Sequence, residues 1–215
     1  MDIAAIRPAG NVKVTRDDWL NAAMAVLVDA GVEQVKILTL SERLAVSRSS
    51  FYWYFEDRQH LLNDLLQVWN TSNTGVIQDH CAQPSATIAE AVLNLFRCFV
   101  GAEAFDHRLD FAVREWARRS ASVRQVVDRA DAARLSAIAA MFARHGYDPA
   151  EAESRARILY YMQIGYFAME LNEPLDERLG RVAGYVAGFT GVSATPAELA
   201  AFIAHVRSST QGDTP

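Results

Sequence analysis

The chain has 215 residues, of which 51% are apolar and 22% charged, a composition typical of one or two globular domains with buried cores. No run approaches the roughly 18 consecutive apolar residues of a membrane-spanning helix, and residues 1–15 lack an apolar stretch long enough for a signal peptide. We therefore expect a cytoplasmic protein with no membrane partner. The net charge of −5 argues against a uniformly basic nucleic-acid binder, so any charge that contacts DNA must be placed locally.

Apolar residues recur at helical spacing along the chain, without sustained period-2 alternation or hairpin signals. The sequence therefore predicts an all-α fold. Residues 1–14 are expected to form a flexible arm. The first helix is predicted over Arg16–Ala30, with Thr15 as its N-cap and Gly31 just after its end. Two short helices follow at about 36–45 and 47–54, and a longer connecting helix at about 57–73.

Asn73, Gly75 and Pro84 indicate a boundary after the connecting helix. Residues 15–62 are then one domain and residues 74–207 a second, helical one, followed by a disordered tail over residues 208–215. Helices are predicted in the second domain at about 87–103, 108–119, 121–145, 149–171, 176–190 and 196–206.

The most informative stretch is Lys36–Leu62, KILTLSERLAVSRSSFYWYFEDRQHLL, because two short helices around a tight break are the layout of a helix-turn-helix. Phe51 and Phe55 are four residues apart and are predicted to pack inward together. Four side chains then point outward from the second helix: Arg48, Ser49, Tyr52 and Trp53. In a major groove, arginine reaches guanine edges and aromatic rings contact thymine methyl groups, so this helix predicts sequence-specific DNA binding.

Over about residues 14–68 the chain resembles the TetR family of transcriptional repressors. That family combines a Thr-Arg start, an apolar first helix ending in Gly, a Val-Ser pair, and Tyr-x-His-Phe followed by a basic residue and Leu. The residues that match are Thr15-Arg16, Gly31, Val46-Ser47, Tyr52, Phe55, Arg58 and Leu61, and the run Phe51-Tyr52-Trp53-Tyr54 is close to the family's recognition helix.

Three positions differ from the family pattern. Lys36 stands where a capping Thr is usual, which would allow the second helix to start later, with Thr39 and Glu42 as a capping box. Ala45 replaces the usual turn Gly, and a left-handed backbone there would cost about 1 kcal/mol. Tyr54 replaces His.

The resemblance implies a three-helix N-terminal DNA-binding domain and a C-terminal domain that dimerises and binds a ligand. It further implies a homodimeric repressor on a near-palindromic double-stranded operator, released by a small-molecule effector. Base edges would be read by Arg48, Ser49 and Trp53, and Tyr52 would contact a base or a phosphate. The implied phosphate contacts are Lys36, Ser50, Tyr54 and Arg58.

Large apolar and aromatic residues are frequent in the second domain, and such residues with a few polar groups are typical of a ligand pocket. The candidate pocket residues are Phe99, Arg114, Trp116, Tyr160, Gln163 and Tyr166. Each could equally be an ordinary core or surface residue. Asp110 and Arg114, four apart on one helix, could simply pair with each other.

Three glycines recur every fourth residue in the helix predicted over 176–190: Gly180, Gly184 and Gly188. Because glycine inside a helix costs about 1 kcal/mol relative to alanine, such a stripe indicates close approach of another helix. The family dimerises through its last two long helices, and the helix over 149–171 offers a partner stripe with Leu159, Met162 and Tyr166. Packing within the same chain is the alternative.

We expect no enzymatic activity, catalytic residues, cofactor or metal. The candidate acid–base groups do not form a nucleophile–base–orienter pattern, and no phosphate loop or metal-ligand spacing is present. Cys81 and Cys98 fit neither a disulfide framework nor a zinc site and are expected to be free thiols. A helical ligand-binding module without DNA binding, a ligand-independent regulator and an activator stay open as alternatives.

Overall fold

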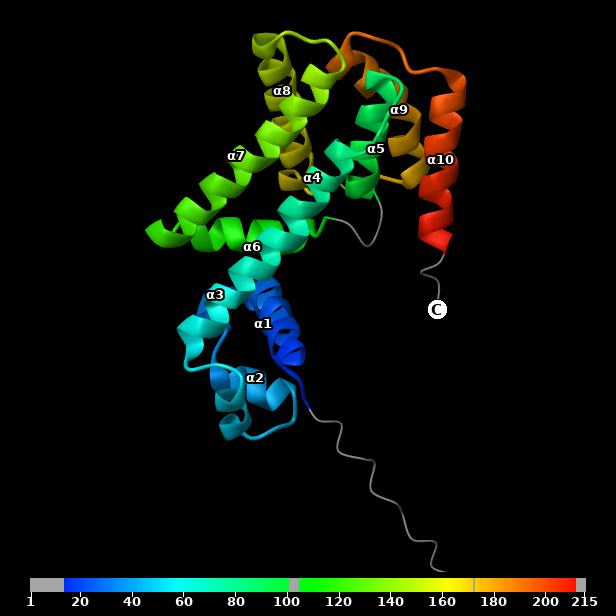
Figure 1. Ribbon diagram of the computed structural model, residues 1–215. Helices are drawn as coiled ribbons and strands as arrows, with labels where there is room; N and C mark the ends of the chain where they lie inside the picture. Colours follow the sequence, from blue (N-terminus) through cyan, green and yellow to red (C-terminus); the bar gives the residue numbers. More distant parts are fainter. Residues whose placement is uncertain (1–13, 101–104, 172, 212–215) are drawn as a thin grey trace, which may run out of the picture. The chain divides into compact units, whose positions relative to one another are not determined.

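The structure is a computed structural model that describes residues 14–100, 105–171 and 173–211. The chain divides into two compact units, residues 1–65 and 66–215. Across the described ranges the regular elements are helices and no strand occurs, which confirms the all-α prediction (Figure 1). None of the helices in these ranges is long and apolar enough to cross a membrane. The expected N-terminal arm falls almost wholly outside the described residues.

The first unit begins with α1 (Arg16–Ala30), which has the predicted bounds. Thr15 caps it in a reciprocal capping box with Asp18, and the main chain leaves the helix at Gly31, whose φ of 80° suits glycine. The elements that follow are η1 (Val32–Gln34), α2 (Ile37–Arg43) and η2 (Arg48–Trp53), a 3-10 helix, and α3 begins at Arg58.

The predicted helix end at Asn73 and Gly75 is wrong. α3 (Arg58–Trp69) continues through one π-helical segment, η3 (Asn70–Thr74), into α4 (Gly75–Ala82). Gly75 has a helical backbone (φ −58°), and the Asn73 side chain is buried, where it donates to the Asp106 carbonyl oxygen and accepts from the Asp106 amide. These residues serve tertiary bonds, so their turn propensity is overridden.

The other predicted helices of the second unit are present. They are α5 (Ile88–Val100), α6 (His107–Ala117), α7 (Ala121–Arg144), α8 (Pro149–Ala168), α9 (Leu175–Thr190) and α10 (Pro196–Gln211). Helix α7 packs against α4, α6 and α8, whereas α5 packs against α4, α9 and α10, so that one apolar core joins these layers (Figure 1).

Helix α10 extends beyond the predicted end near residue 206, so the predicted disordered tail is wrong for residues 208–211. The hydroxyls of Ser208 and Ser209 donate to the carbonyl oxygens of His205 and Val206, and the Val206 side chain is buried. Polar residues that suggested a solvent-exposed tail therefore bond back to their own helix. Residues 212–215 lie outside the described part of the chain.

Candidate DNA-binding surface and ligand cavity

The helix-turn-helix is held from behind by an aromatic cluster. Phe51 and Phe55 are 0% and 2% exposed, with ring centroids 5.2 Å apart, and Trp19 of α1 meets Phe51 edge-on at 5.3 Å. The prediction that both phenylalanines pack inward is confirmed. Because these rings are fixed in the core, the opposite side of η2 must face outward.

That outward side carries the side chains expected to meet DNA. Trp53 is 71% exposed and Tyr52 59%, and Arg48 and Ser49 are exposed as well. The Ser49 hydroxyl lies 2.8 Å from that of Ser47. Ser50 is half-buried and donates to the Ser47 carbonyl oxygen at 2.7 Å, which makes it part of the turn.

Sequence reasoning did not single out one exposed apolar residue of the first unit. Leu38 on α2 is 50% exposed. The signal was available, because Leu38 falls outside the inward-facing stripe that contains Leu40.

Two of the expected phosphate contacts are engaged inside the unit. Arg58 donates from Nε to the Val35 carbonyl oxygen at 2.5 Å and from Nη2 to that of Val32 at 2.6 Å. The Tyr54 hydroxyl donates to the Val14 carbonyl oxygen at 2.9 Å. Both side chains therefore join α3 and η2 to segments distant in sequence.

Lys36 is exposed, is the N-cap of α2, and donates from Nζ to the Gln34 side chain at 3.3 Å. Since α2 starts directly after Lys36, at Ile37, the capping box suggested for Thr39 and Glu42 is wrong: both residues lie inside the helix.

The turn between α2 and η2 depends on Ala45. Its φ is +53°, so the left-handed backbone expected from the family's glycine is present without a glycine. The Ala45 and Val46 amides close the turn by donating to the carbonyl oxygens of Glu42 and Ser41.

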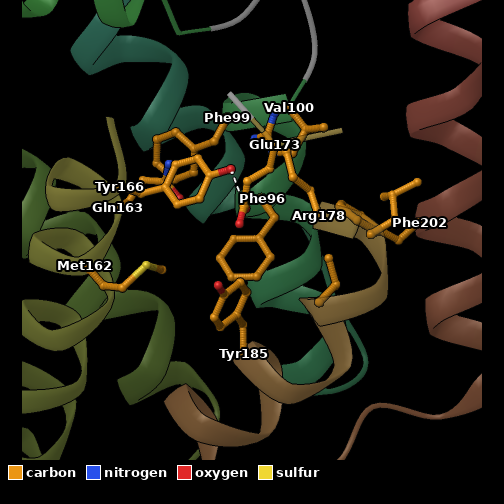
Figure 2. Close-up of a pocket in the computed structure, with 12 residues that line it drawn as sticks. Phe96, Phe99, Val100, Met162, Gln163, Tyr166, Glu173, Arg178, Tyr185 and Phe202 are labelled. Atoms are coloured by element: carbon orange, nitrogen blue, oxygen red, sulfur yellow. Dashed lines mark hydrogen bonds between the residues drawn. The ribbon is translucent and has the colours of Figure 1, made fainter. Parts of the chain in front are cut away.

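The second unit contains a cavity of roughly 530 Å³, part of it open to solvent, between α5, α8, α9 and α10 (Figure 2). Phe99, Gln163 and Tyr166, three of the predicted pocket residues, line it. The other lining residues are Phe96, Val100, Met162, Glu173, Arg178, Leu179, Val182, Tyr185 and Phe202. Sequence reasoning missed these, including both charged ones.

Arg114, Trp116 and Tyr160 do not line this cavity. Trp116 is buried elsewhere in the core. The Arg114 guanidinium binds Asp110 at 2.7 Å and Asp131 at 2.6 Å, and it donates to the Tyr160 hydroxyl at 3.0 Å. The pairing of Asp110 with Arg114, which the sequence left open, is therefore present.

These groups belong to a buried ionic cluster that also includes Arg134. Asp110 and Arg134 are both 0% exposed, and Arg134 Nη2 lies 3.0 Å from Asp110 Oδ1. Arg134 also donates to the hydroxyls of Tyr160 and Thr74, and its guanidinium lies over the rings of Trp69 and Phe105. Two arginines and two aspartates make the cluster neutral, as burial requires. Burial raises the pKa of Tyr160, so its hydroxyl stays protonated and donates to Asp131.

The predicted dimer residues are not all accessible. Leu159 is 0% exposed in its own chain, so it cannot contact a second copy. Met162 and Tyr166 line the cavity. By contrast, the three glycines of α9 are exposed, and a Cβ at any of them would meet nothing within 4 Å.

The two cysteines are free, as expected, and both are buried, which raises the pKa of Cys81 to about 12. In the described ranges, no group of three histidine, cysteine or acidic residues is placed to hold a metal ion.

Comparisons with known proteins agree with this geometry. The family model described as "Bacterial regulatory proteins, tetR family" matches residues 20–65. Tetracycline repressor protein class C from Escherichia coli is 33% identical over 61 residues, which is 28% of this chain and 28% of that repressor. The family model thus matches residues of the first unit, and the match to the repressor spans under a third of the repressor's length.

Solved structures extend the similarity to the fold of nearly the whole chain. Mycobacterium smegmatis AmtR is 19% identical, with a TM-score of 0.55 over 97% of this chain and all of that one. A candidate transcriptional regulator from Streptomyces coelicolor A3(2) is 17% identical (TM-score 0.57; 82% of this chain, 98% of that one). The multidrug binding protein EbrR, solved with imidazole, is 20% identical (TM-score 0.54; 84% and 97%).

A helix-turn-helix whose second helix exposes arginine and aromatic side chains has the layout of a DNA-binding domain. The family that residues 20–65 of this first unit match is the TetR family of bacterial regulatory proteins.

Proposed function

We propose that the protein is a cytoplasmic, ligand-responsive repressor that binds a near-palindromic operator as a homodimer. The observation that carries the proposal is the exposed face of η2. Trp53 and Tyr52 present large apolar surfaces to solvent from a helix whose other side is fixed by Phe51. Such exposure of aromatic side chains is typical of a binding surface.

In this proposal Arg48, Ser49 and Trp53 read base edges, and Tyr52 contacts a base or a phosphate. Arg48 suits the task because no described residue pairs with its guanidinium. Lys36 and Ser50 contact phosphates at the ends of α2 and η2. Tyr54 and Arg58, whose polar atoms already bind main-chain carbonyl oxygens, are assigned a different role: they position the reading helix.

A homodimer is supported by the free face of α8 and α9. Ile158, Tyr161 and Met169 of α8 and its C-terminal end are 59%, 53% and 70% exposed, at spacings that place them on one side. A Cβ at Gly180 or Gly184 would meet no atom of the described residues within 4 Å, so a second copy is what their small size would admit closely. Ile158 and Tyr161 replace Leu159 in the interface we propose.

Dimerisation and palindromic recognition go together. Two helix-turn-helix units related by a two-fold axis would reach successive major grooves, whose centres lie about 34–36 Å apart. The operator is therefore expected to consist of two inverted half-sites.

The ligand response is assigned to the cavity. Its walls on α8 and α9 belong to the same helices as the proposed dimer face, so an occupant would act on the dimer geometry. An effector can shift the protein between DNA-bound and released states only by its difference in affinity for them.

The experiment is selection of random duplex DNA by the purified full chain. The wild type is expected to enrich a palindromic sequence, and the double variant Arg48→Ala with Trp53→Ala is expected to lose the enrichment while keeping its fold. Arg124→Ala, which removes an exposed arginine of α7, is the matched control and should enrich the same sequence. Equal enrichment by the double variant would refute the contact assignment. No enrichment by any variant, with no co-purified molecule detected by mass spectrometry, would refute the repressor itself.

A further inference from the structure

Gln163 presents an amide to the cavity. The residue is 7% exposed and lines the cavity, and its side-chain amide forms no hydrogen bond with a described residue. The amide atoms are not among the fully buried atoms that lack a partner, so they face the open space of the cavity, where an occupant can bond them. An occupant that offers both a donor and an acceptor, such as another amide, would complete this group.

The two charged residues that line the cavity, Glu173 and Arg178, differ in whether they have an ion-pair partner. Both carboxylate oxygens of Glu173 are engaged: one lies 2.6 Å from Arg181, and the other accepts a hydrogen bond from the Tyr166 hydroxyl at 3.0 Å (Figure 2). Arg178 also lines the cavity, with its guanidinium 5.4 Å from the Tyr166 ring centre. Among the described residues no carboxylate lies within ion-pair distance of Arg178.

Glu173 is therefore paired with Arg181, which also lies 3.4 Å from Glu177 outside the cavity, whereas Arg178 lines the cavity without a carboxylate partner among the described residues. A cationic occupant would have to compete with Arg181 for Glu173 and would also meet Arg178. An anionic occupant would meet an arginine whose planar fork matches a carboxylate.

The rest of the wall is apolar and largely aromatic. Phe96, Phe99 and Phe202 come from α5 and α10, and Val182 and Tyr185 from α9. An occupant that fills the space between these side chains should therefore present an apolar body to them.

We propose that the effector is an amphipathic carboxylate with an amide or similar polar group within an aromatic or aliphatic body. Arg178 binds the carboxylate, Gln163 bonds the internal polar group, and the phenylalanines enclose the body. This inference rests on the proposed function in one respect, that the cavity is the effector site.

The test uses three probes that share a benzamide body and differ in the terminal group. They are N-benzoyl-6-aminohexanoate, its primary carboxamide, and N-(6-aminohexyl)benzamide, which carries an ammonium group. Binding of each to the full chain is measured by isothermal titration calorimetry without DNA. The carboxylate is expected to bind about tenfold or more tighter than the other two, the effect of one charge-assisted bidentate contact.

Variants separate the two polar contacts. Arg178→Gln should abolish the preference for the carboxylate, and Arg178→Lys should restore part of it. Gln163→Leu should weaken all three probes by a similar factor, because they share the amide. Arg124→Gln, an exposed arginine of α7, should bind like the wild type. Thermal unfolding of each variant checks that it is folded.

Three outcomes overturn the inference: equal or tighter binding of the ammonium or carboxamide probe, an undiminished preference in Arg178→Gln, or no binding of any probe at millimolar concentration. The proposed function fails separately. A carboxylate preference in a protein that selects no DNA would refute the repressor and leave the ligand class standing. If the protein selects DNA and a cationic or neutral molecule releases it, the proposed ligand class is refuted and the repressor stands.

Discussion

Asp110→Ala is expected to destabilise the protein more than any change at its surface. Asp110 is completely buried and meets three donors: Trp69 Nε1 at 3.0 Å, Arg114 Nε at 2.7 Å and Arg134 Nη2 at 3.0 Å. Without this carboxylate, buried Arg134 keeps only Asp131 as an ionic partner, at 3.8 Å.

Removing one partner of a buried ion pair typically costs about 3–5 kcal/mol, because the other charge stays buried. The orphaned indole N–H of Trp69 adds about 1 kcal/mol or more. We therefore expect a loss of about 4 kcal/mol in the free energy of unfolding, against about 5–15 kcal/mol for a whole domain. In urea, with a slope of about 1–3 kcal/mol per molar, the midpoint should fall by at least about 1 M.

Asp128→Ala on α7 is the matched control. This aspartate binds Arg124 at 2.8 Å, but both side chains are more than half exposed, so the loss should stay below about 1 kcal/mol. The double variant Asp110→Ala with Arg134→Met should be more stable than Asp110→Ala alone, since it removes the unpaired cation. If the free energy of unfolding of Asp110→Ala lies within about 1 kcal/mol of the wild-type value, the ionic cluster does not stabilise this domain as argued.

Three further changes test other parts of the chain. Ala45→Gly should raise the free energy of unfolding by about 0.5–1 kcal/mol, because the φ of Ala45 is +53° and glycine adopts this backbone without strain. The control Ala140→Gly, inside α7, should lower the free energy of unfolding by about 1 kcal/mol. A destabilised Ala45→Gly protein would contradict this account. Burial acts to raise the pKa of Asp131, but the hydrogen bonds and charge of Arg114, the Tyr160 hydroxyl and the charge of Arg134 together outweigh it and lower the pKa overall. The resulting stability is present above the unfolded pKa of about 4 and is lost as the pH falls through the folded pKa, so Asp131→Asn should flatten acid unfolding below about pH 4. Burial raises the pKa of Cys81 to about 12, so iodoacetamide at pH 8 should label this thiol only after unfolding, and rapid native labelling would show that the core opens.

Local signals in the sequence were sufficient for α1 and for the inward side of η2. The bounds of α1 follow from a capping threonine and a terminal glycine, and the inward pair Phe51 and Phe55 follows from their spacing. The left-handed turn at Ala45 could be expected only through the family's glycine, because nothing local to alanine favours it.

The sequence was insufficient wherever a residue's role depends on a distant partner. Arg58 was expected to contact phosphate, but it binds carbonyl oxygens more than 20 residues away. The π-helical segment at Asn70–Thr74 persists because Asn73 and Thr74 bond to α6 and α7. Arg178 was not selected, since its lack of a partner becomes visible only when Glu173 is seen paired with Arg181.

The same long-range contacts suggest how the two halves of the proposed function communicate. Tyr160 and Gln163 are one turn apart on α8, so the helix that presents Gln163 to the cavity also presents Tyr160 to the ionic cluster. Arg134 of that cluster donates to Thr74 in η3, the segment into which α3 continues. Because a packed helix moves as a unit, an occupant that displaces α8 would disturb the hydroxyl shared by Arg114, Arg134 and Asp131. In the proposed repressor, the strain would reach η3 at its π-helical turn, where the α-helical bonding pattern is already interrupted.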